Sequence, residues 1–200
     1  MNTMNTAKIL SFVILFFTIT INAQKKIKVS EDAFVQGGDT KNTTFGVEKS
    51  NALMVANSKK SGKYSRNSYL KFEITEDIKD KKIILHIPVK VFNKSGDEST
   101  LFNLEVYTVE DNTWSENEIT FENKPSLGKK IGGIEIPESV DKKMSWQKIE
   151  LDTKEVSALL NQSKSTTLSL ALVNLEFNKT SAMMGAKEKS KKFSSYITIE

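Results

Sequence analysis

Residues 81–93 read KKIILHIPVKVFN, and apolar side chains recur at every second position of this segment. Alternate positions form an apolar set and a more polar set, namely Leu85, Ile87, Val89 and Val91, and His86, Pro88 and Lys90. A period of two is typical of a β-strand with one buried face, whereas an amphipathic helix has a period of 3.6 residues. The segment therefore predicts a half-buried strand.

The same alternation occurs on both sides of this segment, in residues 68–74, 101–109 and 166–174. In SYLKFEI, for example, Leu70 and Phe72 would point inward, and Tyr69 and Lys71 outward. Turn-forming residues lie between the candidate strands, at 37–39, 61–63, 94–99, 124–130 and 131–137. Many short strands at this spacing predict a single antiparallel β-sandwich of jelly-roll type over residues 27–200.

One segment has a helical pattern instead. In DTKEVSALLNQ, residues 152–162, Asp152 has the position of an N-cap and Glu155 that of its partner in a capping box. Val156, Leu159 and Leu160 form an apolar stripe on one side. We expect one short helix that closes one end of the sandwich.

The N-terminal residues resemble a secretory signal peptide. Lys8 precedes an apolar run from Ile9 to Ile21, and Ala23 supplies the small residue of a cleavage site. This run of about 13 residues is too short to span a bilayer, which takes about 20. We expect a signal peptide over 1–23, a domain over 24–200, and an exported protein, periplasmic or extracellular, with no membrane span after cleavage.

The composition excludes several kinds of chemistry. The chain has no cysteine and one histidine, His86, so it cannot supply a thiol nucleophile, a cysteine zinc site or a multi-histidine metal site. Removal of residues 1–23 takes away Lys8 and no acid, which leaves 28 basic and 25 acidic residues. This near balance, together with the absence of a phosphate-binding glycine loop, gives no support for a nucleic-acid or nucleotide partner.

Residues 111–125, DNTWSENEITFENKP, place Trp114 and Phe121 in an otherwise polar run. The two rings are either an exposed platform for a ligand or anchors that hold a loop on the core. Two large aromatic side chains can supply the burial that a polar crossover lacks. We therefore favour the anchors.

In chain order the landmarks are EDAFVQGG, NTTFG, RNSYLKFEI, LFNLEVYTV, NTWSENEITFENKP, SWQKIELDTKEV and GAKEKSKKFSSYITI. The sequence resembles the exported bacterial jelly-roll modules called DNRLRE domains, which overlap carbohydrate-binding module family 96. The resemblance runs from about Glu31 to the C-terminus. It implies non-catalytic binding, with acidic polysaccharides of the alginate type as the leading ligand, and it makes Trp114, Thr120, Phe121 and Pro125 parts of the scaffold.

For the binding site we expect cations and aromatic rings that point away from the apolar sides of their strands. A uronate carboxylate can accept a hydrogen bond from an ammonium, and a tyrosine can cover the apolar face of a sugar. Tyr69, Lys71, Lys90 and Tyr107 would share one sheet face, with Arg66 and His86 at its margin. Lys187 belongs to the basic-acidic pair that the family tends to carry near its end. The predicted ligand-binding residues are Arg66, Tyr69, Lys71, His86, Lys90, Tyr107 and Lys187.

Two other functions remain open from the sequence. An adhesive or matrix protein would need no defined sugar specificity. A jelly-roll polysaccharide lyase would need a base and a cation, roles that His86, Tyr107, Lys90 and Arg66 can be given.

Asp32 and Asp39 lie in loop-like sequence of the kind that holds structural calcium in exported jelly rolls, but two acids fall short of six to eight oxygen ligands. A structural calcium ion therefore stays open but unsupported, and we predict no cofactor. Non-catalytic binding remains the leading hypothesis.

Overall fold

The computed structural model describes residues 25–46, 52–57, 63–93, 101–139, 142–177, 180–188 and 192–200. The predicted signal peptide and the predicted turn at 94–99 lie outside these ranges. The elements are β1 (Lys26–Gln36), a short 3-10 helix (Gly38–Thr40), β2 (Ala52–Ala56), β3 (Arg66–Glu73), β4 (Ile83–Asn93), β5 (Phe102–Val109), β6 (Lys130–Ile136), β7 (Ser145–Leu151), α1 (Thr153–Ser163), β8 (Thr167–Val173), β9 (Thr180–Gly185) and β10 (Tyr196–Ile199).

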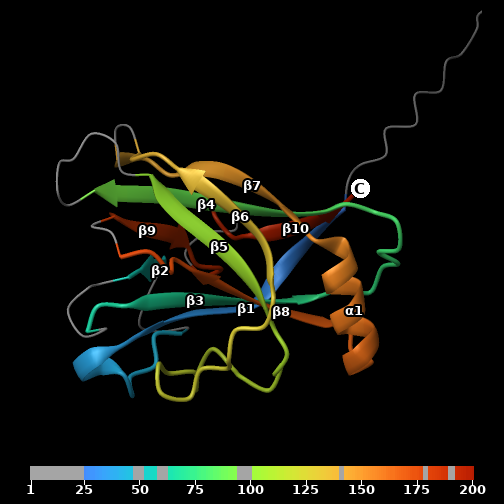
Figure 1. Ribbon diagram of the computed structural model, residues 1–200, viewed down its shortest axis with the longest axis horizontal. Helices are drawn as coiled ribbons and strands as arrows, with labels where there is room; N and C mark the ends of the chain where they lie inside the picture. The colour runs from blue at the N-terminus through green and yellow to red at the C-terminus, as the bar shows by residue number, and fades with distance from the viewer. Residues whose placement is uncertain are drawn as a thin grey trace, which may run out of the picture.

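The strands form two antiparallel layers (Figure 1). The first sheet has the order β6-β5-β8-β3-β1. In the second sheet, β4 pairs with β7 along one edge and with β10 and then β9 along the other, and β2 follows β9. β1 joins the layers, because residues 26–28 pair with β10 and residues 29–36 with β3. The predicted antiparallel β-sandwich of jelly-roll type is confirmed.

The core lies between the layers and consists of alternate strand residues, as the period of two predicts. Leu85, Ile87 and Val89 of β4 are fully buried, and so are Leu70 and Phe72 of β3. Burial of this apolar surface must supply the stability of the fold, since the chain contains no disulfide.

The predicted helix is present as α1, at one end of the sandwich (Figure 1). The Asp152 carboxylate accepts hydrogen bonds from the backbone N–H groups of Lys154 and Glu155. The capping box is not reciprocal, because Glu155 forms an ion pair with Lys129 at 2.6 Å and the Asp152 N–H donates to Ile131. Within the described ranges, no helix combines the length and the apolar character needed to cross a bilayer.

The turn predicted at 131–137 is wrong, since residues 131–136 belong to strand β6. Ile131 and Ile136 are buried and hold the strand on the core, which outweighs the two glycines between them. Gly132 has a packing role. A Cβ atom at this position would lie 3.0 Å from the Glu150 carbonyl oxygen of β7, so the glycine lets β6 and β7 approach closely.

The crossover, residues 110–129, lies over the outer face of the first sheet (Figure 1). Trp114 is only 7% exposed, and its indole N–H donates to Ser169 Oγ at 3.1 Å. Its ring meets the ring of Tyr69 edge-on, with the centroids 5.9 Å apart. Phe121 packs partly buried against the same cluster. The interpretation of the two aromatic residues as anchors is confirmed, and a second, smaller core lies beneath the crossover.

Candidate functional site: an aromatic face flanked by lysines

The outer face of the second sheet carries a row of polar and aromatic side chains. Strand pairing sets Lys148 of β7 beside His86 of β4, His86 beside Tyr196 of β10, and Tyr196 beside Lys28 of β1. Each residue of the row neighbours a buried core residue in sequence, so the row points away from the core. We call Lys26, Lys28, His86, Trp146, Lys148 and Tyr196 the lysine–aromatic face.

Three rings lie together on this face. His86 and Tyr196 stack with centroids 4.4 Å apart and planes 10° apart. Trp146 is 42% exposed, and its ring lies 5.4 Å from that of Tyr196 with a tilt of 56°. The Lys26 ammonium lies over the Tyr196 ring, 4.4 Å from its centroid. The arrangement offers a flat apolar surface next to positive charge.

A cavity of about 490 Å³ opens on the lysine–aromatic face. Its lining consists of Lys26, Lys28, Val29, Trp146, Lys187, Lys192, Ser194 and Tyr196. Four of these described side chains are lysines and none is acidic. A cleft lined in this way favours an anionic ligand, because its charges attract from several sides at once.

His86 is the buried member of the lysine–aromatic face. It is buried, and its Nε2 lies 2.8 Å from the Thr198 hydroxyl. Burial lowers the pKa of His86, and the positive charges of Lys148 and Lys26 lower it further. The imidazole is therefore neutral at neutral pH, and the Tyr196 ring stacks on it.

The predicted site residues do not share one face, which corrects our expectation. His86 and Lys90 belong to β4 in the second sheet, whereas Tyr69, Lys71 and Tyr107 lie on the outer side of the first sheet. Strand parity was right for each strand. The two groups are nevertheless separated by the thickness of the sandwich. The outer sides of the two sheets point in opposite directions, so outward residues of different sheets do not meet.

Tyr69 and Lys71 are buried beneath the crossover. The Tyr69 hydroxyl donates to the Pro125 carbonyl at 3.3 Å, and burial raises the pKa of this phenol. The Lys71 ammonium forms an ion pair with Glu31 at 2.7 Å and donates to the Trp114 carbonyl at 2.5 Å. Both side chains thus hold the crossover on the sheet.

Tyr107 and Lys90 are partly exposed. The Tyr107 hydroxyl donates to Glu105 Oε2 at 3.2 Å, and burial raises the pKa of Tyr107. The Lys90 ammonium lies 4.6 Å from the centroid of the Phe92 ring.

Arg66 also lies apart from the lysine–aromatic face. Its Nε donates to Gln36 Oε1 at 2.6 Å, and burial lowers its pKa. Together with Phe92, it lines a second cavity of about 390 Å³.

Lys187 is the predicted site residue that reaches the cavity. Its ammonium also lies 2.8 Å from Glu116 and pairs with Glu188. Burial alone would lower the pKa of Lys187, but these two hydrogen bonds outweigh it, so the pKa lies above its ordinary value.

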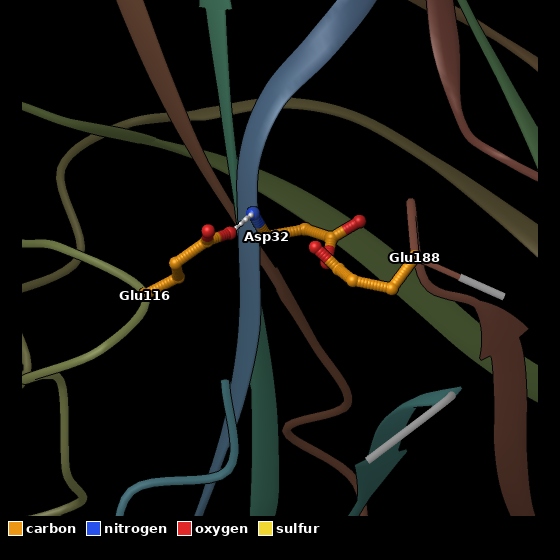
Figure 2. Close-up of side chains that lie close together, drawn as sticks. All are labelled: Asp32, Glu116 and Glu188. Atoms are coloured by element: carbon orange, nitrogen blue, oxygen red, sulfur yellow. Dashed lines mark hydrogen bonds between the residues drawn. The ribbon is translucent and has the colours of Figure 1, made fainter. Parts of the chain in front are cut away.

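Three carboxylates gather beside Lys187, from Asp32, Glu116 and Glu188 (Figure 2). Burial, together with the negative charges of Glu188 and Glu116, raises the pKa of Asp32 to about 7, although the Lys187 N–H and charge act in the opposite sense. Asp39 is not part of this group and instead forms an ion pair with Lys63 at 2.6 Å.

Sequence reasoning missed five residues of the lysine–aromatic face, namely Lys26, Lys28, Trp146, Lys148 and Tyr196. A signal for Trp146 was present, since SWQKIEL alternates and sets Trp146 opposite Ile149 and Leu151. A large aromatic residue on the polar side of a strand needs either a cover or a ligand.

The model of carbohydrate-binding module family 96 matches residues 23–200. The chain belongs to this family. The predicted resemblance is thereby confirmed, and the family assigns carbohydrate binding to the module. Among curated proteins no match is found.

The comparison with solved structures finds a match to the N-terminal endo-1,4-beta-D-xylanase 10B of Clostridium thermocellum, comprising CBM22-1 and GH10 modules in complex with xylohexaose. The identity is 12%, and the match covers 88% of the family 96 module and 27% of the xylanase chain. The module therefore spans about a quarter of that chain's length. The TM-score is 0.31, so no conclusion about the fold or the ligand of this module rests on the match.

Proposed function

We propose that this family 96 module binds an anionic polysaccharide on the lysine–aromatic face and does not cleave it. The observation that carries the proposal is the exposed Trp146 ring beside the stacked Tyr196 and His86 rings, with Lys26 and Lys28 at their edge. A sugar ring has an apolar face of C–H groups that packs on such a surface. The His86 ring is held in place by its hydrogen bond with the Thr198 hydroxyl and by its stacking on Tyr196.

The lysines determine the charge of the ligand. An ammonium is a compact charge that forms a charge-assisted hydrogen bond with either a carboxylate or a sulfate. A neutral glycan would desolvate the ammonium groups of Lys26 and Lys28 without forming such bonds, whereas the Lys187 ammonium already pairs with Glu116 and Glu188. Among anionic glycans we place an alginate-type uronate polymer first, because it presents carboxylates at regular intervals along a stiff chain.

The same geometry supports binding without catalysis. A lyase base must reach a proton of the sugar, but His86 is buried and its Nε2 is engaged with Thr198. The other residues considered for a lyase site, Tyr107, Lys90 and Arg66, lie outside the lysine–aromatic face. We further propose that the module is exported by the predicted signal peptide and meets the polysaccharide outside the cytoplasm.

A glycan panel tests this function. The purified protein is titrated with alginate, polygalacturonate, a sulfated fucan and a neutral glucan at low and moderate salt. We expect binding to the anionic polymers, weakening as salt rises because surface charges are screened. No unsaturated uronate absorbance and no new reducing ends should form. Equal affinity for the neutral glucan at both salt concentrations would contradict the proposed ligand class, and sustained product formation would contradict the non-catalytic role.

A further inference from the structure

Asp32, Glu116 and Glu188 come from three distant segments and converge on one point. Asp32 lies in β1, Glu116 in the crossover, and Glu188 directly after β9. One oxygen from each carboxylate lies within 4.8 Å of the others. Figure 2 shows the carboxylate of Glu188 turned toward that of Asp32, with Glu116 on the other side of the β1 backbone.

Asp32 lacks the bonds that a buried carboxylate normally has. It is only 2% exposed. Its Oδ2 accepts the backbone N–H of Lys187 at 2.8 Å, and its own N–H donates to Glu116 Oε2 at 3.2 Å. Its Oδ1 is buried and has no hydrogen-bond partner among the described residues. A buried polar atom left in this way is costly unless an ion, a proton or water meets it.

The cluster also has too little positive charge. The Lys187 ammonium is shared between Glu116 and Glu188, and the hydrogen bond from Lys187 to Asp32 is donated by the backbone N–H. The nearby Lys71 is already paired with Glu31. A divalent cation bound here would hold all three carboxylates ionised, and it would neutralise the two negative charges that one ammonium leaves.

We propose that Asp32, Glu116 and Glu188 bind a calcium ion. The donors are all carboxylate oxygens, which suit a hard cation and not one that prefers nitrogen or sulfur. Calcium accepts irregular arrangements of six to eight oxygens, with carbonyls and water completing the set, whereas magnesium demands near-ideal octahedral geometry. The ion would join β1, the crossover and the segment after β9. This inference does not depend on the proposed glycan.

Terbium luminescence and calcium-dependent melting test the site. Full-length mature protein is treated with EDTA and then titrated with Tb³⁺, for which Trp114, two residues from Glu116, is a suitable antenna. We expect sensitised emission that Ca²⁺ displaces, and a melting temperature that rises with Ca²⁺, because a ligand bound to the native state stabilises it by mass action. Asp32→Asn should weaken Ca²⁺ binding at least about tenfold.

Two further variants keep the test decisive. Asp39→Asn removes an acid outside the cluster and should leave the calcium response unchanged. If Asp32→Asn fails to fold, Glu188→Gln serves instead, because Glu188 lies nearer the surface than Asp32. Absence of sensitised emission and of a Ca²⁺-dependent shift in the unmodified protein would overturn the proposal. An unchanged response in the foldable cluster variant would also overturn it.

Discussion

The two outer faces of the sandwich carry similar residues in different surroundings. On the first sheet, the Lys71 ammonium lies 4.5 Å from the centroid of Trp114, and on the second, Lys26 lies 4.4 Å from that of Tyr196. The crossover covers the first pair, whereas nothing in the described chain covers Trp146 in the same way. Trp114 is accordingly 7% exposed and Trp146 42%. The same cation-on-ring contact is therefore part of the core on one face and available to a ligand on the other.

Removal of each tryptophan should separate the two faces most clearly. Trp114→Ala empties the small core beneath the crossover and should cost about 3 to 5 kcal/mol of unfolding free energy, the range for a large buried aromatic. Chemical denaturation measures this cost. Trp146→Ala, as a surface change, should cost no more than about 0.5 kcal/mol. Similar losses of stability in both variants would remove the distinction between a covered and an open face.

The two outward lysines give the next largest difference. Lys71→Ala leaves Glu31 Oε1 and the Trp114 carbonyl without the ammonium donor, and should cost about 1.5 to 3 kcal/mol. Lys90→Ala, the matched control on β4, should change stability by no more than about 0.5 kcal/mol. Thermal melts and glycan titrations are run on both variants. Lost glycan affinity in a stably folded Lys71→Ala protein would show that the crossover face takes part in binding.

The lysines of the open face should act through charge alone. Lys26→Ala, Lys28→Ala and Lys148→Ala should each lower affinity for an anionic polysaccharide modestly, since exposed ion pairs contribute about 0 to 1 kcal/mol each. The triple variant should bind with a shallower dependence on salt, which titrations at several ionic strengths measure. Lys41→Ala, at an exposed ion pair with Glu122 under the crossover, serves as the control. An unaltered salt dependence in the triple variant would place the anion site elsewhere.

The smallest expected effect is a pH dependence from His86. The pKa of His86 is lower in the folded protein than its ordinary value of 6.5, so below that pH the unfolded chain binds more protons. His86 should therefore lower the stability as the pH decreases through about 6.5, whereas Asp32, whose pKa is raised to about 7, should increase it over the same range. The contribution of His86 is the difference between the unmodified protein and His86→Gln. Melting temperatures between pH 5 and 8 test the effect. A stability that falls more steeply on acidification in His86→Gln than in the unmodified protein would contradict the predicted sign.

The strand pattern predicted much of the fold and less of the site. Parity fixed which side of each strand points inward, and Leu85, Ile87, Leu70 and Phe72 are buried as predicted. Parity could not show which outer face the crossover covers, because that depends on contacts between residues far apart in sequence, such as Trp114 with Ser169. Tyr69 was consequently assigned to a binding face although it is fully buried.

The missed residues have the same cause. Tyr196 and Lys28 lie at opposite ends of the sequence and meet only because β10 pairs with the first residues of β1. The acidic cluster likewise joins Asp32 to Glu188, although the sequence suggested Asp39 as its companion. Local patterns predict the elements, whereas a site assembled from several strands requires their pairing.

Titration of Trp146→Ala with alginate oligosaccharides tests the central claim most directly. Phe177→Ala is the matched control, because Phe177 is 60% exposed and follows β8, outside the lysine–aromatic face. Calorimetry should show at least about a tenfold loss of affinity in Trp146→Ala, or about 1.4 kcal/mol, with an unchanged melting temperature. Phe177→Ala should bind like the unmodified protein. Unchanged affinity in Trp146→Ala, with the unmodified protein binding alginate, would contradict the assignment of the open face as the binding site.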